Sequence, residues 1–170
     1  MPQQHARIQH EAEPKEGYIS KLIAQGEHQQ LDFKFGVNDS RKIARTLAAF
    51  ANTDGGRLLI GVKDNGSIAG VRSEEEFYML QAASEMFTRP AVPFEVKEWT
   101  INQKRVLEVI VPAIKGVLHS APVEKDNYLI YIRVKDENYT VNSVWLKAYK
   151  WRNSPSGTFI RFGENEKFLL

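Results

Sequence analysis

The chain contains no cysteine, and this absence excludes disulfides, zinc–thiolate sites and thiol nucleophiles. It also lacks any apolar run close to the roughly 20 residues with which a helix crosses a bilayer. The polar segment 1–16 has no apolar core of the kind found in a signal peptide. These absences favour a cytoplasmic protein with no membrane partner. The net charge of +2 is too small by itself to indicate another partner.

Several catalytic and nucleotide-binding motifs are missing as well. The chain has no Walker P-loop, no Gly-x-Ser-x-Gly elbow and no His-Glu-x-x-His zinc motif. The glycine-rich stretch 50–71 follows an expected helix and opens a strand, which reverses the order of a dinucleotide-binding fingerprint. The segment "DNGSIAG" is similar to the Asp-x-Gly-x-Gly box of histidine-kinase-type ATPases. The helix and glycine-rich lid that accompany that box are missing, so ATP binding is only an alternative.

The same glycines have a simpler interpretation as turn residues. A tight turn requires a positive φ that glycine adopts without steric cost, and this requirement accounts for Gly55, Gly56 and Gly66. Asn52 and Thr53 stand where the preceding helix is expected to end. Residues there either cap the last helical carbonyls or bind a phosphate, and we favour the cap.

Hydrophobic periodicity predicts most of the secondary structure. Apolar residues recur at helical spacing or alternate with polar ones. The expected helices are 17–25, one that starts after a cap at Asp39 or Ser40 and stops at Gly55 or Gly56, and 73–87. The expected strands are 29–35, 57–62 with a return at 67–71, 94–101 and 104–112 as a hairpin, and 127–134. This order predicts an α+β fold in which two main helices pack on a mixed or antiparallel sheet. The expected organisation is a flexible arm (1–16), one domain (17–145) and a basic, aromatic C-terminal arm (146–170).

Details of these elements follow from capping and alternation. The run "QQLDFKF" alternates, so we expect a half-buried strand with Asp32 and Lys34 on its solvated face. Asp39 or Ser40 is expected to cap the second helix, which ends at Gly55 or Gly56. Ser73 and Glu76 have the spacing of a capping box at the start of the third.

The residues "LDFKF" and "RKIARTLAAFANTDGGRLLIGVKDNGSIAGV" together form a recognisable pattern. It resembles the Schlafen AlbA-type domain, a DNA-binding domain common in bacterial regulators. The resemblance is dense from Gly26 to Val71 and continues through "KRVLEVIVP" and "YIRV", so that it covers residues 18–145. It implies a nucleic-acid-binding domain of a bacterial DNA-binding or transcriptional regulator, without catalysis.

The resemblance also implies an alternative that involves catalysis. In the family's animal members the domain is part of an RNA-cleaving core that depends on three acids, and the matching positions here are Glu27, Asp32 and Asp64. Asp32 replaces the glutamate usual in the family. These carboxylates are the candidate catalytic residues and metal ligands for Mg²⁺ or Mn²⁺. No cofactor is expected unless this alternative holds. On the simpler interpretation, Asp64 is a turn residue and Asp32 pairs with Lys34 or Lys63.

Basic residues are the candidate phosphate ligands. One group lies around the second helix and the following strand, and a second lies in the C-terminal arm. They are Lys34, Arg41, Lys42, Arg45, Arg57 and Lys63, and Lys147, Lys150, Arg152 and Arg161. Aromatic residues interleave with the second group, and they either stack on bases or pack the arm. The expected partners are DNA or RNA and a second copy of the chain in a homodimer or higher assembly. A dimerisation or ligand-sensing module is the third interpretation.

Overall fold

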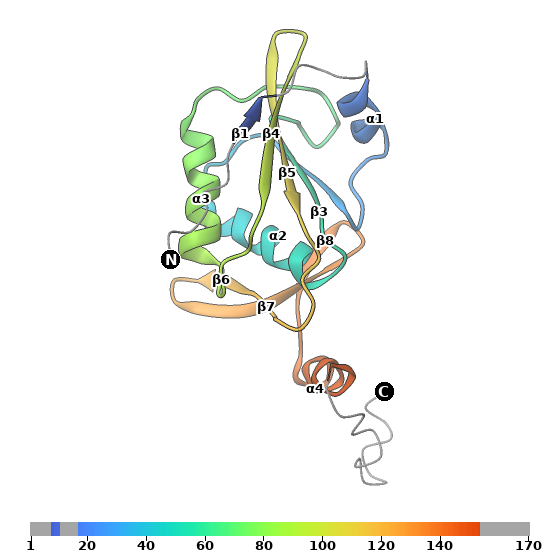
Figure 1. Cartoon of the computed structure of the whole chain (residues 1–170), viewed down its shortest axis with the longest axis vertical. Coiled ribbons are helices and arrows are strands. Elements are labelled where there is room, and N and C mark those ends of the chain that lie inside the picture. Colours follow the sequence, from blue (N-terminus) through green and yellow to red (C-terminus); the bar gives the residue numbers. More distant parts are fainter. Residues whose placement is uncertain (1–7, 11–16, 154–170) are drawn as a thin grey trace. The chain divides into compact units, whose positions relative to one another are not determined.

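The computed structural model describes residues 8–10 and 17–153, which fall into one unit within residues 1–139 and a second within residues 140–170. Both helices and strands are present, which confirms the α+β class (Figure 1). The helices are α1 (Tyr18–Ala24), α2 (Ser40–Asn52), α3 (Glu75–Phe87) and α4 (Ser143–Arg152). The strands are β1 (Ile8–His10), β2 (Leu31–Lys34), β3 (Gly56–Ile60), β4 (Glu95–Ile101), β5 (Lys104–Val111), β6 (Ser120–Glu124), β7 (Asn127–Val134) and β8 (Glu137–Thr140).

Over the described residues, the main sheet is mixed, with strand order β1-β4-β5-β3-β2. β2 runs parallel to β3 and β1 runs parallel to β4, whereas β5 is antiparallel to both β3 and β4. The predicted 94–112 hairpin is confirmed as β4 and β5. The turn between these strands places Asn102 and Gln103 at φ values of 49° and 65°. β3 lies inside the sheet, which explains why its sequence is apolar on both faces.

The described residues also form a second sheet of three strands, in the order β6-β7-β8. The hydrophobic periodicity predicted β7 but neither β6 nor β8, so the sequence did not predict this second sheet. α2 packs against β6 and β7, and it therefore lies between the two sheets. Arg45 strengthens this contact, because its guanidinium donates hydrogen bonds to the backbone carbonyls of Pro122 at 2.8 Å and Val123 at 2.6 Å.

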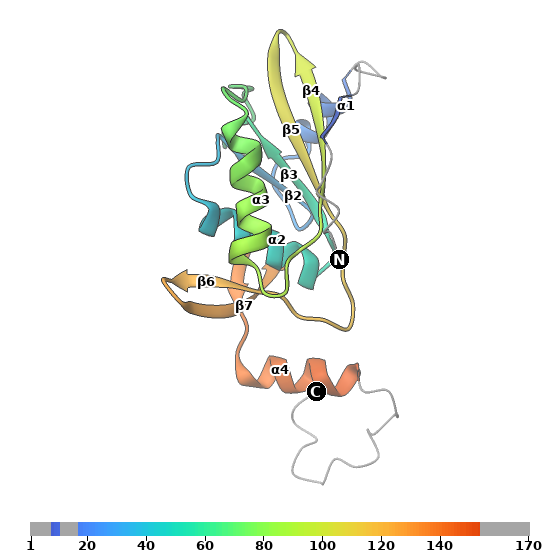
Figure 2. The same cartoon turned by 60° about the vertical axis from the view of Figure 1, so that its left-hand side comes forward.

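The main sheet is covered on both faces (Figure 2). On one face, Leu58 and Ile60 of β3 pack against α2 and α3. On the other face, Leu59 joins Ile19 of α1 and Phe33 of β2 in a second apolar cluster. Because successive side chains of a strand point to opposite faces, the position of each residue along β2, β3 and β5 decides which cluster surrounds it.

The ends of α2 form largely as the sequence predicts. The Asp39 side chain accepts a hydrogen bond from Arg41 N at 3.0 Å, and the Thr53 hydroxyl donates to the Ala49 carbonyl at 2.8 Å. Gly55 has the expected positive φ, at 70°. The positive φ expected at Gly56 is wrong, because Gly56 already belongs to β3 and has no positive φ. A side chain at Gly56 is excluded by space instead, since a Cβ would lie 2.8 Å from the ring of Phe50.

Two expectations about single elements are wrong. The capping box does not form, because α3 begins at Glu75 and its N-cap, Glu74, makes no side-chain cap hydrogen bond. The returning strand expected at 67–71 is only a bridge between Val62 and Ile68. Residues Ile8–His10, which lie in the segment expected to be a flexible arm, form β1. The chain divides into its two units between Tyr139 and Thr140. In the described ranges, no helix combines the length and the apolar character needed to cross a membrane.

Candidate nucleic-acid interface

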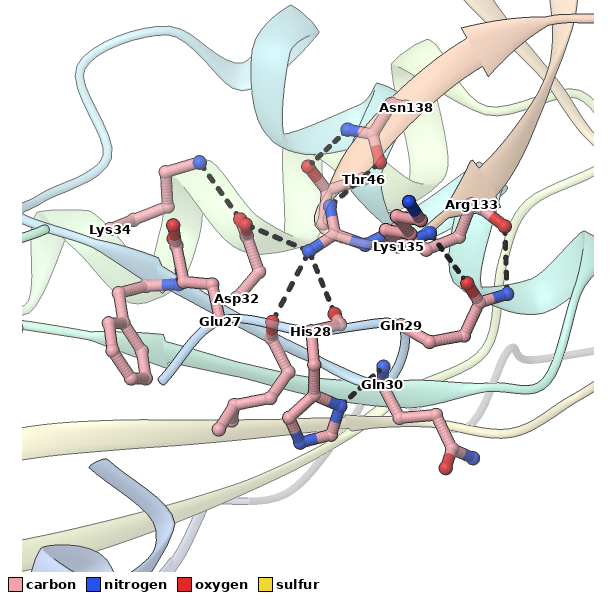
Figure 3. A network of polar contacts seen from close by, with 12 residues as sticks. Glu27, His28, Gln29, Gln30, Asp32, Lys34, Thr46, Arg133, Lys135 and Asn138 are labelled. Carbon is pink, nitrogen blue, oxygen red and sulfur yellow. Dashed lines mark hydrogen bonds and ion pairs between the residues drawn. The ribbon is translucent and has the colours of Figure 1, made fainter. Parts of the chain in front are cut away.

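Asp32 lies in a buried ion pair and not on a solvated face, so this part of the strand prediction is wrong. Asp32 stands opposite Leu58 in the pairing of β2 with β3, and its side chain therefore points to the face that α2 covers. Its carboxylate is 5% exposed. Oδ1 accepts a hydrogen bond from Arg133 Nη2 at 3.1 Å, and Lys34 Nζ lies 2.8 Å from Oδ2 (Figure 3). The expected pairing with Lys34 is thus confirmed, but in a buried setting.

Arg133 connects this carboxylate to the second sheet. It comes from β7, and its Nη2 also donates to the carbonyls of His28 and Leu31, each at 3.2 Å. Nη1 donates to Asn138 Oδ1 at 3.0 Å, and the guanidinium lies over the ring of Phe50, 5.0 Å from its centroid. One buried side chain therefore holds together β2, α2 and the β7–β8 hairpin.

Glu27 lies beside Asp32, as the resemblance implies. The chain turns back after Gly26, which has φ of 70°, and His28 and Leu31 exchange backbone hydrogen bonds. Glu27 Oε1 accepts a hydrogen bond from Phe33 N at 2.9 Å. Burial raises the pKa of Glu27, the Phe33 hydrogen bond opposes that rise, and the negative charge of Asp32 adds to it. The two carboxylates therefore interact with each other.

Asp64 does not complete a metal site with them. It is exposed in the tight turn between Val62 and Ile68, which Gly66 closes with φ of 85° and a 2.8 Å hydrogen bond to the Lys63 carbonyl. Among the residues that the structure describes, no three His, Asp or Glu side chains form a group that could hold a metal ion. The residues therefore do not fit the three-acid Mg²⁺ or Mn²⁺ site that the resemblance implies. Arg133 and Lys34 supply the positive charge beside Asp32.

The predicted basic residues of the larger unit fall into two classes. Lys34, Arg45 and Arg57 interact within the fold: Lys34 with Asp32, Arg45 with β6, and Arg57 Nε with Glu108 Oε2 at 3.3 Å. Arg41, Lys42 and Lys63 are exposed. Arg41 lies over the ring of Phe87, 4.9 Å from its centroid. Arg57 is 45% exposed as well, but its charge is paired with the buried Glu108, so the second class contains the better candidates for phosphate contact.

The predicted basic residues of the smaller unit lie on α4. Asn142 caps this helix by accepting a hydrogen bond from Trp145 N at 2.8 Å. Lys147, Lys150 and Arg152 are exposed, and the helix contains no acid. The rings of Trp145 and Tyr149 are stacked, with centroids 5.4 Å apart. The remaining predicted basic residue, Arg161, lies outside the described residues.

A second buried carboxylate lies on the opposite face of the main sheet. Glu108 of β5 stands opposite Leu59 and therefore faces α1. Its oxygens accept hydrogen bonds from Tyr18 Oη at 2.5 Å and Trp99 Nε1 at 3.3 Å, in addition to the ion pair with Arg57. Burial and the hydrogen bond to Glu108 raise the pKa of Tyr18 to about 12. Glu108 is held by its donors and has the character of a structural group.

Asn52 links α2 to the second sheet. Its amide donates hydrogen bonds to the carbonyls of His119 at 2.8 Å and Tyr131 at 2.7 Å, and it accepts one from His119 N at 2.8 Å. Of the two residues expected to cap the end of α2, Thr53 does so through its bond to the Ala49 carbonyl, whereas Asn52 connects to the second sheet.

Sequence reasoning missed two residues of this region, Arg133 and Arg72. Arg133 had a signal, because a charged residue inside the apolar run "NYLIYIRV" requires a buried partner. Arg72 had none, since it follows a short irregular segment and lies near Phe35 only in the folded chain.

Comparison with known proteins agrees with the pattern of residues around β2, α2 and β3. The family model described as Schlafen, AlbA_2 matches residues 27–142, which is more than half of the chain. The chain belongs to this family. Membership in the Schlafen, AlbA_2 family points to a function related to nucleic acids. No curated protein is significantly similar to the chain.

Two solved structures are similar to this Schlafen, AlbA_2 chain. The DIP2311 protein from Corynebacterium diphtheriae matches with a TM-score of 0.55 and 20% identity, over 80% of this chain and 28% of its own. The N-terminal domain of a RecG-related protein from Nitrosomonas europaea matches with a TM-score of 0.42 and 18% identity, over 74% of this chain and 95% of its own. The first likeness shows a shared fold, and the chain spans little more than a quarter of that protein.

Proposed function

We propose that this chain of the Schlafen, AlbA_2 family binds nucleic acid as part of a DNA-binding regulator, and that it does so without cleaving its ligand. The observation that carries the proposal is helix α4, whose 10 residues include Lys147, Lys150 and Arg152 and no acid. Exposed cations that no neighbouring acid neutralises attract a phosphate backbone and release its counterions. The larger unit carries exposed cations of its own, among them Lys42 and Lys63.

The arrangement of the acids supports binding without cleavage. Asp32 forms ion pairs with Arg133 and Lys34, and Asp64 stands apart in an exposed turn. Metal-assisted cleavage requires carboxylates that can turn their oxygens to a shared ion. Asp32 would have to give up a buried ion pair to do so, and that exchange is unfavourable.

Fluorescence anisotropy across a range of salt concentrations tests the binding proposal. We expect labelled DNA or RNA to bind and the affinity to fall steeply with salt. Replacing Lys147, Lys150 and Arg152 together with glutamine is expected to lower the slope of log K against log salt by about 2–3, because each phosphate contact contributes about 0.7–0.9.

The matched control replaces Lys21, Lys115 and Lys125, which are exposed on the larger unit, so that the change in net charge is the same. We expect the control to keep the slope. Absence of binding to every DNA and RNA tested would refute the proposed function. RNA cleavage in Mg²⁺ or Mn²⁺ that disappears in both Asp32→Ala and Asp64→Ala would restore the nuclease alternative. The expected homodimer remains a prediction, which light scattering can test.

A further inference from the structure

Phe35 is an aromatic side chain that the fold leaves in solvent. It directly follows β2 and is 52% exposed, whereas the aromatic residue within β2, Phe33, is 2% exposed. Phe35 belongs to neither apolar cluster of the described residues. A single exposed apolar side chain is ordinary on a protein surface, so the ring suggests a function only together with the charged groups that lie around it.

Two cations lie against this ring. Lys63 Nζ is 5.9 Å from the ring centroid and Arg72 Cζ is 5.8 Å from it. Both distances fall within the roughly 6 Å over which a cation is attracted to the face of an aromatic ring. The result is a small surface of Phe35, Lys63 and Arg72, which we call the Phe35 surface.

Three separate segments form the Phe35 surface. Gly61 N and Val62 N donate hydrogen bonds to the Lys34 carbonyl at 2.8 and 3.2 Å, and these bonds extend the parallel pairing beyond β2 and β3. The pairing brings Phe35 next to Lys63, the first residue of the tight turn. Arg72 follows the segment that returns from this turn. The surface is therefore held by the end of the main sheet and does not depend on a long loop.

We propose that Phe35 stacks on an unpaired base of a single-stranded nucleic acid while Lys63 and Arg72 bind the adjoining phosphates. This inference rests on the proposed function and adds a ligand class to it. Any base offers a flat face to an aromatic ring, so the contact tolerates different sequences. A base inside a duplex already stacks on both neighbours and offers no free face. The Phe35 surface is therefore selective for unpaired bases.

Acids near the Phe35 surface make stacking the larger part of this contact. Asp64 follows Lys63 in the same turn. Burial raises the pKa of Glu76, and a hydrogen bond from the Arg72 backbone and the charges of Arg105 and Arg72 oppose that rise, so Glu76 lies near Arg72. These carboxylates weaken the local attraction for phosphate. Loss of the ring should therefore lower affinity without a large change in salt dependence.

The test compares three ligands with the whole chain: a short single strand of uridine or thymidine nucleotides, a duplex of the same length, and inorganic polyphosphate. Polyphosphate carries the charge but no base. We expect Phe35→Ala to weaken single-strand binding about tenfold, within the range that base–aromatic stacking supports. Binding of duplex and polyphosphate should stay within about twofold, and Phe35→Trp should restore the single-strand affinity.

Tyr78→Ala is the matched control, because Tyr78 is an aromatic residue of α3 that is 65% exposed. We expect no change in this variant. If the wild-type chain binds single strands and Phe35→Ala binds them equally well, the inference is overturned and the proposed function stands. Equal losses for all three ligands would also overturn it, because the ring would then act on the fold or on charge. If the wild-type chain binds no nucleic acid, both proposals fail.

Discussion

Replacing Arg133 with methionine tests whether the buried ion pair connects the two sheets. The substitution keeps the apolar stem but removes the charge beside Asp32 and the donors to the carbonyls of His28 and Leu31. Removing one partner of a buried ion pair costs about 3–5 kcal/mol. Lys34 remains 2.8 Å from the carboxylate and offsets part of the loss, so we expect about 3 kcal/mol. For a chain of this size, that corresponds to a melting temperature lower by about 6–12 °C.

Thermal and urea unfolding, followed by circular dichroism, measure this loss. Lys42→Met is the control, because Lys42 is exposed on α2, and we expect it to change stability by less than about 0.5 kcal/mol. Adding Asp32→Asn to Arg133→Met removes the charge left behind. The double variant should therefore be more stable than the sum of the single changes predicts, by about 1–3 kcal/mol. Strict additivity, or an Arg133→Met melting temperature within experimental error of the wild type, would refute the reasoning.

The remaining predictions concern two other sites of the larger unit. Gly55→Ala should destabilise the protein clearly more than Gly26→Ala, because both residues have φ of 70° but only at Gly55 would a Cβ meet backbone atoms, at 2.7 and 2.8 Å; equal losses in urea unfolding would show that the φ alone matters. Tyr18→Phe should remove the phenol that titrates near pH 12 from the ultraviolet absorbance titration. Because this pKa lies above the unfolded value near 10, the stability that Tyr18 contributes is complete below pH 10 and is lost between pH 10 and 12. Loss of a phenol that titrates near pH 10 would contradict the assignment.

Sequence predicted those elements whose signals are local. α2 has a capping aspartate, an apolar stripe and a glycine stop within one short segment, and all three appear in the structure. The β4–β5 hairpin likewise follows from two alternating runs around a short polar turn. β6 and α4 gave no comparable signal. β6 contains Pro122, which weakens a strand prediction. The sequence of α4 has no apolar stripe on one face, and accordingly none of its residues is buried.

The candidate site was predictable only in part. The positions of Glu27 and Asp32 beside each other followed from the family resemblance, and the turn at Asp64 followed from its Asp-Asn-Gly sequence. The burial of Asp32 did not follow, because its partner Arg133 lies 101 residues further along the chain. A strand that alternates in sequence is half-buried only if one of its faces meets solvent. Here the second sheet, which the periodicity did not predict, supplies the arginine on the polar face of β2.

The pairing of β2, β3 and β5 decides which cations of the larger unit are occupied inside the fold. Asp32 stands opposite Leu58 and Glu108 stands opposite Leu59, so the main sheet carries one carboxylate on each face. A buried carboxylate is stable only when cations or hydrogen-bond donors surround it, and Arg133 and Arg57 are therefore committed to these two groups. Cations that bind an external phosphate must come from places where no such acid claims them. Two such places are the exposed turn after β3, which carries Lys63, and helix α4, which contains no acid.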